Sequence, residues 1–129
     1  MTPELTALIL AALLQTVQFA IYSVLANLQV GTKTALGPRD TPVQLTGTAG
    51  RAQRAMNNHF EGLLLFAIAA LAITYADKGS AWTATASITY LVARVLYVPA
   101  YLLGLTPWRS VIWMVGFFAT LALLLMAVV

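Results

Sequence analysis

The feature that most constrains this chain is an apolar run without charge from residue 5 to residue 32. The run exceeds the roughly 20 residues that an α-helix needs to cross a bilayer. A second such run extends from residue 110 to residue 129. Of the 129 residues, 60% are hydrophobic and only 9% are charged, whereas soluble domains carry roughly 25% charged residues. The sequence therefore predicts an integral membrane protein.

Two shorter runs without charge lie between these, at 62–76 and 79–93. Each has only about 15 residues, so a helix that crosses a bilayer there must extend into the polar flanking residues. The predicted fold class is an all-α integral membrane protein, a four-transmembrane-helix bundle formed by a single domain over 1–129. The expected spans are 5–30, 50–77, 80–104 and 109–128, and the Gly-, Pro- and Thr-rich segment 31–49 is expected to be a cytoplasmic loop.

Basic residues near the predicted helix ends set the expected orientation. Four of them cluster around the first connection and one at the third, whereas the opposite side offers only Lys78. The five are Lys33, Arg39, Arg51, Arg54 and Arg109. Because cytoplasmic loops are enriched in Lys and Arg, we expect the first and third loops in the cytoplasm and both termini outside it. The expected location is a bacterial inner membrane.

Charge and cysteine content exclude several functions. The formal net charge of +3 comes from seven basic and four acidic residues, and no basic tract could follow a phosphate backbone. Nucleic acid is therefore not an expected partner. The chain has no cysteine, which excludes disulfides, thiolate metal sites and a cysteine nucleophile. We expect no metal site.

The second predicted span carries a polar stripe. Arg51, Arg54, Asn58 and Glu61 are spaced three, four and three residues apart, which places them on one helix face. At about 1.5 Å per residue, Glu61 lies about 15 Å from Arg51, near the middle of the membrane. A stripe of this kind cannot face lipid.

The third predicted span carries a matching stripe of Tyr90, Arg94, Tyr97 and Tyr101. Arg94 lies about 15 Å inward from the end of its helix, at the level of Glu61. An unpaired charge at that depth costs at least a few kcal/mol, so the two stripes are expected to face each other or to line one water-filled cavity. The structural alternative is that these residues only hold helices together, as an ion pair or as interhelical hydrogen bonds.

The stripes carry more positive than negative charge, since three arginines accompany a single glutamate. Arginine binds carboxylates through two parallel hydrogen bonds, and a deep glutamate suits an amine. The pattern therefore favours a small ligand that has carboxylates and an ammonium group.

The segments "RAQRAMNNHFE" and "RVLYVPAYLLGLTPWRS" resemble the signature of membrane-associated proteins in eicosanoid and glutathione metabolism, the MAPEG family. The similarity covers essentially the whole chain. It implies a homotrimer whose sites lie between adjacent subunits and bind bent glutathione near the cytoplasmic side. It also implies a glutathione-dependent transferase or peroxidase, with glutathione as co-substrate and a lipophilic electrophile or lipid hydroperoxide arriving from the membrane lipids.

The resemblance also assigns roles to residues. Four residues of the second span would hold the carboxylates and amine of glutathione, and three of the third span would complete the binding pocket. Arg109, with Ser110 beside it, would form the catalytic pair that stabilises the sulfur as thiolate. The seven binding residues are Arg51, Arg54, Asn58, Glu61, Arg94, Tyr97 and Tyr101.

Two departures from the family pattern keep a second function open. Gly31 stands where the eicosanoid branch tends to carry a basic residue, and Trp113 stands where some members place a tyrosine. The alternative is a non-catalytic MAPEG-like protein that binds a small anion or serves as a membrane interaction module.

Other polar and aromatic residues are expected to have structural roles. His59 falls off the stripe spacing, which favours a helix contact or an interfacial role over catalysis. Ser110 lacks His–Asp support in the sequence and is not expected to be a nucleophile. Trp82, Trp108 and Trp113 lie near span ends and are expected to act mainly as interfacial anchors.

Overall fold

Four long helices form the fold in the computed structural model, which describes residues 1–38 and 40–129. They are α1 (Pro3–Val30), α3 (Gly47–Tyr75), α4 (Ala81–Leu102) and α5 (Trp108–Val128). Each is long and apolar enough to cross a membrane. The described residues contain no strand. The prediction of an all-α bundle with four long apolar helices is therefore confirmed.

The first connection differs from the predicted loop over 31–49. It contains a short helix, α2 (Thr32–Leu36), and α3 begins at Gly47 rather than at residue 50. Gly31 separates α1 from α2 with a positive φ of 85°, a conformation that glycine adopts without the steric cost of a Cβ. Arg39, one of the basic residues used to predict orientation, lies outside the described residues.

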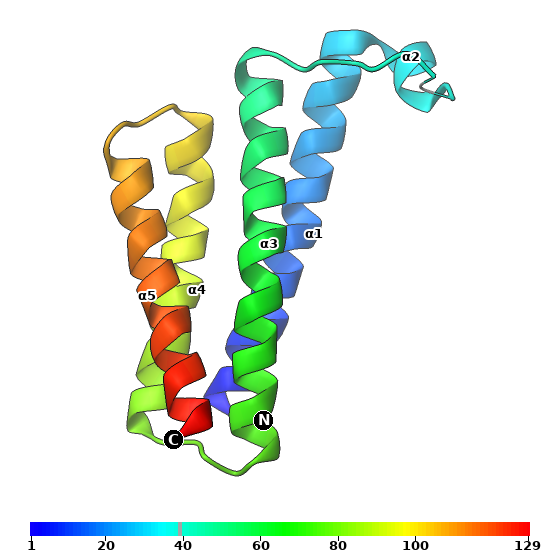
Figure 1. The fold of residues 1–129 in the computed structure, drawn as a ribbon. Coiled ribbons are helices and arrows are strands. Elements are labelled where there is room, and N and C mark those ends of the chain that lie inside the picture. Colours follow the sequence, from blue (N-terminus) through cyan, green and yellow to red (C-terminus); the bar gives the residue numbers. More distant parts are fainter. Residues whose placement is uncertain (39) are drawn as a thin grey trace.

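The long helices pack as two adjoining pairs. α1 lies along α3 and α4 lies along α5, while α3 also contacts both α4 and α5 (Figure 1). The core between them combines large side chains, including Phe66, Ile73, Tyr90 and Leu123, with a set of alanines. The Phe66 and Tyr90 rings stack with centroids 4.0 Å apart. Alanines at helix contacts let backbones approach closely, which is how packing stabilises bundles in lipid.

Polar contacts tie the helices together at the end that holds both termini. Glu4 of α1 is buried and accepts a hydrogen bond from the Thr83 hydroxyl of α4. Ser80 and Thr83 form a capping box that starts α4. Lys78 donates from Nζ to the Ala127 carbonyl, 2.8 Å away, near the end of α5. Both termini and the α3–α4 turn thus share one end of the bundle, opposite α2 and the α4–α5 connection (Figure 1).

We predict that a reporter fused after Val129 is active only outside the cytoplasm. The basic residues at the opposite end, including Arg51, Arg54 and Arg109, should hold that end in the cytoplasm. The measurement compares two topology reporters, one active in each compartment. A truncated fusion after Gly104, in the α4–α5 connection, is the matched control and should show the reverse pattern. Cytoplasmic activity of the Val129 fusion would overturn the orientation.

Candidate functional site

The two polar stripes face each other across the contact between α3 and α4. Near the α2 end of the bundle, Arg51 Nε donates to the Leu102 carbonyl at 3.0 Å. One turn deeper, Arg54 Nε donates to the Tyr101 hydroxyl at 3.1 Å. Deeper still, Arg94 Nη1 donates to Asn58 Oδ1 at 3.0 Å. These three hydrogen bonds descend along the interface in the order that the helical spacing predicts.

Two guanidinium groups approach the ring of Tyr101. The Arg109 guanidinium carbon lies 4.7 Å from the ring centroid and that of Arg54 lies 5.9 Å from it. The Tyr97 ring lies beside them, with its centroid 5.5 Å from that of Tyr101. Within the described part of the chain, no carboxylate forms an ion pair with either arginine. The cluster therefore carries positive charge that no described residue neutralises.

A cavity of about 370 Å³ opens below this cluster, and we call it the loop-side cavity. Residues from α3, α4 and α5 line it: Asn58, Tyr97, Arg109, Ser110, Trp113 and Met114. Arg109 and Ser110 belong to the first turn of α5. A helix N-terminus and a guanidinium both stabilise an anion, so this cavity suits a negatively charged group.

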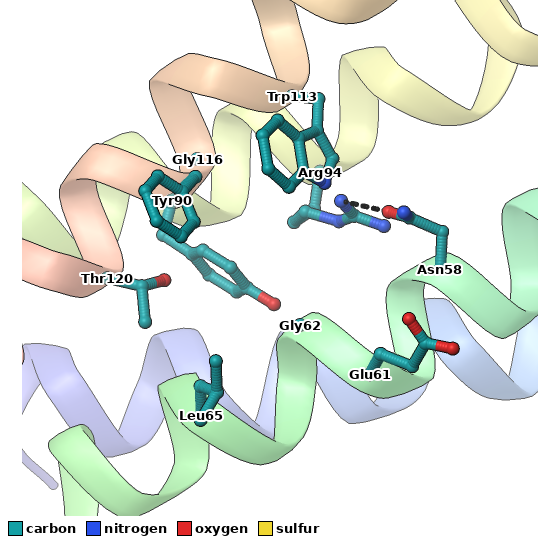
Figure 2. Close-up of a pocket in the computed structure, with 10 residues that line it drawn as sticks. Asn58, Glu61, Gly62, Leu65, Tyr90, Arg94, Trp113, Gly116 and Thr120 are labelled. Atoms are coloured by element: carbon teal, nitrogen blue, oxygen red, sulfur yellow. Dashed lines mark hydrogen bonds between the residues drawn. The ribbon is translucent and has the colours of Figure 1, made fainter.

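A second cavity, the deep cavity, has a volume of about 190 Å³ and shares Asn58 and Trp113 with the first. Figure 2 shows its labelled side chains, which come from α3, α4 and α5. Its other lining residues are Glu61, Gly62, Leu65, Tyr90, Arg94, Gly116, Phe117 and Thr120. Glu61 and Arg94 thus line one cavity and form no ion pair with each other. The interhelical hydrogen bonds of the structural alternative are present, at Arg51, Arg54 and Arg94.

His59 holds Arg94 in place. The Arg94 guanidinium donates from Nε to His59 Nδ1 at 3.1 Å, and His59 Nε2 lies 2.8 Å from the carbonyl oxygen of Ala11 in α1. Because a carbonyl can only accept, Nε2 carries the proton and Nδ1 is the acceptor, which defines a neutral imidazole. The predicted helix-contact role of His59 is confirmed, since the fully buried ring links α1, α3 and α4.

The structure does not gather all nine predicted site residues around one space. Asn58, Tyr97, Arg109 and Ser110 line the loop-side cavity, whereas Glu61 and Arg94 line the deep one. Tyr101 contacts the Arg109 guanidinium, and Arg54 contacts Tyr101, but neither Arg54 nor Tyr101 lines a cavity. Arg51 lines neither cavity and bonds to Leu102 and Thr48.

Trp113 is the aromatic residue whose place differs from the prediction, and Tyr90 is a cavity residue that the predicted binding set does not include. Trp82 and Trp108 are exposed near helix starts, as anchors would be, but Trp113 lies further along α5 and lines both cavities. The sequence predicts Tyr90 on the polar stripe of the third span, and the structure shows that Tyr90 lines the deep cavity. Its position four residues before Arg94, on the same helix face, was the available signal.

We predict that His59→Ala lowers the free energy of unfolding by roughly 2 to 4 kcal/mol, because it leaves a buried guanidinium N–H without an acceptor. His59→Gln, which keeps one donor and one acceptor, should lose less. Reversible unfolding in mixed micelles measures both. Asn57→Ala, an exposed neighbour on α3, is the control and should stay close to the unaltered protein. Equal stability of the alanine variant and the unaltered protein would contradict the assigned role.

Comparison with known proteins gives one match. A family model described as the MAPEG family matches residues 5–129. No curated protein and no solved structure matched the chain. The matched range includes both polar stripes and every residue that lines the two cavities.

Proposed function

The chain belongs to the MAPEG family, and we propose that it is a membrane-bound, glutathione-dependent transferase or peroxidase that acts on lipophilic electrophiles through a bound thiolate. Its family and its four apolar helices make it an integral, multi-pass membrane protein. Because the family includes non-catalytic members, the activity has to be argued from the site itself.

The observation that carries the proposal is the cluster of positive charge above the loop-side cavity. Arg54 and Arg109 both approach the Tyr101 ring, and no described carboxylate neutralises them. Glutathione has two carboxylates and one ammonium group, so it is an anion near neutral pH. Arginines bind carboxylates with two parallel hydrogen bonds. The excess charge therefore supports a peptide of this kind as the ligand.

Arg109 is the residue best placed to act on the sulfur. It lines the loop-side cavity from the first turn of α5, where its charge and the helix dipole both stabilise an anion. Only the thiolate attacks an electrophile. Attack on an electrophilic carbon forms the C–S bond of a conjugate while a bond from that carbon to a leaving group or epoxide oxygen breaks and carries its electron pair away. Attack on a hydroperoxide breaks the O–O bond, and the departing oxygen takes a proton to become an alcohol; the sulfenic form of glutathione then reacts with a second glutathione to give the disulfide and water. Ser110 would add a hydroxyl donor beside the sulfur.

The remaining binding residues have groups available for the rest of the peptide. Asn58 lies at the boundary between the two cavities. Arg51 donates from Nε and Nη2 to protein oxygens, which leaves Nη1 for a ligand carboxylate. The Glu61 carboxylate is exposed and unpaired among the described residues, so it is free to accept from the ligand amine.

The exposure of Glu61 also supports assembly as a homotrimer, the state that the family resemblance implies. Glu61 lies about 15 Å into its span and is exposed on the single chain. A carboxylate at that depth would face lipid at a cost of a few kcal/mol unless a neighbouring subunit covers it.

We predict that cross-linking of the protein in mild detergent stops at three subunits. The exposed Glu61 carboxylate requires a covering neighbour, and the family resemblance implies that the closed assembly has three copies. The measurement is the ladder of cross-linked species on a denaturing gel, with a fully denatured sample as the control. A protein that remains monomeric or dimeric while it still binds glutathione would reject the trimer.

One observation favours the alternative of a non-catalytic member that binds a small anion. Gly31 has a φ of 85° and ends α1, so the turn itself favours glycine at the position where the eicosanoid branch of the family tends to carry a basic residue. Lys33 is exposed on α2. Loss of one carboxylate contact would weaken peptide binding, and the thiolate measurement below separates the two functions.

We predict that glutathione added to the purified protein gives the ultraviolet absorbance of a thiolate, and that Arg109→Ala raises the pKa of the bound thiol. Turnover should fall by roughly 10²-fold or more, as expected when one electrostatic stabiliser is removed, while binding changes much less. Lys33→Ala, a basic residue away from both cavities, is the matched control. Binding without thiolate absorbance in the unaltered protein would favour the non-catalytic alternative.

Glu61→Gln should show the converse behaviour, because its proposed partner is the ligand amine rather than the sulfur. We predict a weaker affinity for glutathione with nearly normal thiol ionisation in the complex that forms. Calorimetric titration gives the affinity, and the absorbance titration gives the thiol pKa. Equal losses of binding in the Arg109→Ala and Glu61→Gln variants, with an unchanged thiol pKa, would show that the two roles are misassigned.

A further inference from the structure

Trp113 and Phe117 form a pair of nearly parallel rings on α5 beside the two cavities. Their ring centroids lie 5.2 Å apart and the ring planes differ by 13°. Trp113 lines both cavities, and Phe117 lines the deep one. Residues four positions apart share one face of a helix, so Arg109, Trp113 and Phe117 follow one another along the same face of α5. The aromatic pair therefore begins one turn beyond the proposed site of the sulfur.

The stacking shows which face of the indole is free. Phe117 lies one turn further along α5 than Trp113 and covers one face of the indole. The opposite face is directed back toward the turn of Arg109, where Trp113 lines the loop-side cavity. The indole is also the largest ring among the residues that line this cavity. It therefore offers a broad, flat apolar surface next to Arg109.

An electrophile that reaches the sulfur has to lie over this indole. In the proposed function Arg109 holds the sulfur, and Trp113 lies about 6 Å further along the helix axis. Reacting atoms approach each other to about 3 to 3.5 Å, so the body of a small electrophile spans the distance between the sulfur and the indole. A flat substrate can thus react at one edge while its ring face rests on Trp113.

An indole face favours a particular kind of electrophile. Its π face carries partial negative charge, so a ring that has lost electron density to its substituents is attracted to it. An alkyl chain gains from the same contact only the burial of its apolar surface. Stacking of aromatic rings adds a roughly two- to tenfold advantage beyond that burial. The contact therefore discriminates between flat, electron-poor rings and flexible chains.

We propose that Trp113 is a specificity-determining residue, and that its indole face selects planar, electron-poor electrophiles over flexible alkyl electrophiles. The inference deepens the proposed function and rests on it for the position of the sulfur. The selecting face lies between Trp113 and the turn of Arg109. The selection therefore requires no opening toward lipid, and it is compatible with a neighbouring subunit that covers Glu61.

For an activated aryl halide, the reaction is a substitution at the ring. The thiolate forms a C–S bond with the ring carbon that carries the halogen, while a π electron pair moves into the ring and its electron-withdrawing groups. That pair then returns to the ring, and the halide leaves with the electron pair of the C–halogen bond. No proton is transferred. Stacking on Trp113 orients the ring so that the reacting carbon faces the sulfur.

The test compares Trp113→Leu and Trp113→Phe with the unaltered protein in lipid nanodiscs. The measurement is kcat/KM at saturating glutathione for chlorodinitrobenzene, which is planar and electron-poor, and for iodohexane, a flexible alkyl halide. Trp113→Leu should lower the ratio of the first value to the second by roughly two- to tenfold. Trp113→Phe keeps a ring and should lower the ratio less. Trp108→Leu, which alters a tryptophan that is 63% exposed and lines neither cavity, is the matched control and should leave the ratio unchanged.

A purely structural role for Trp113 gives a different result. In that case Trp113→Leu lowers kcat/KM equally for both electrophiles, and an unchanged or increased ratio overturns the proposal. The pKa of the bound thiol, measured from its thiolate absorbance, should stay the same because Arg109 is intact. If the leucine variant does not fold, Trp113→Met takes its place, since methionine removes the ring and adapts to irregular spaces.

Binding of the two reaction products separates this inference from the proposed function. The dinitrophenyl and hexyl conjugates of glutathione are titrated by calorimetry, which requires no turnover. Weaker binding of the dinitrophenyl conjugate alone in Trp113→Leu, in a protein that catalyses neither reaction, supports the stacking face and rejects the proposed function. Turnover of both electrophiles with the same ratio in every variant supports the proposed function and overturns the selection by Trp113.

Discussion

The burial of one guanidinium within the membrane is the constraint on which the rest of this bundle depends. Arg94 sits among apolar helices, where an unsatisfied charge would be costly. The hydrogen bonds that satisfy the Arg94 guanidinium of α4 involve two further helices. His59 and Asn58 come from α3, and the carbonyl that holds His59 comes from α1. Tyr97 adds its ring face 4.4 Å from the guanidinium carbon. These contacts fix the rotation of α1, α3 and α4 relative to one another, and apolar packing alone would fix it less well.

Small residues also determine how closely the helices pack. Alanines along α1, α3 and α5 allow close helix contacts in the core, and Phe66 stacks on Tyr90 beneath the polar layer. Gly62 of α3 and Gly116 of α5 lie beside the deep cavity. A Cβ on Gly116 would meet Ala93, Arg94 and Tyr90 at 3.6–3.9 Å. Gly62 and Gly116 both line the deep cavity, where neither adds a side chain to fill the space beside the buried core.

Hydropathy and helical spacing predict much of this structure. Charge-free runs locate the four long helices, and the spacing of Arg51, Arg54 and Asn58 predicts the face that meets α4. The rest depends on information that spacing does not carry. The partner of His59 is a backbone carbonyl at Ala11, which any residue in α1 could supply, so no sequence pattern marks it. The two cavities share Asn58 and Trp113, an arrangement of side chains that helical spacing does not specify. Helix α2 follows a glycine turn within a polar segment, which hydropathy does not predict.

The arginines differ in how firmly the protein holds them, and this difference bears on their chemistry. Arg94 is fixed by two hydrogen bonds, so its guanidinium cannot move toward a ligand. Arg109 contacts the Tyr101 ring face instead of a carboxylate. A ring face attracts a cation without cancelling its charge, whereas a carboxylate partner would weaken the field at any neighbouring sulfur. Tyr101 can thus keep Arg109 close to the loop-side cavity while its full positive charge remains available to a thiolate.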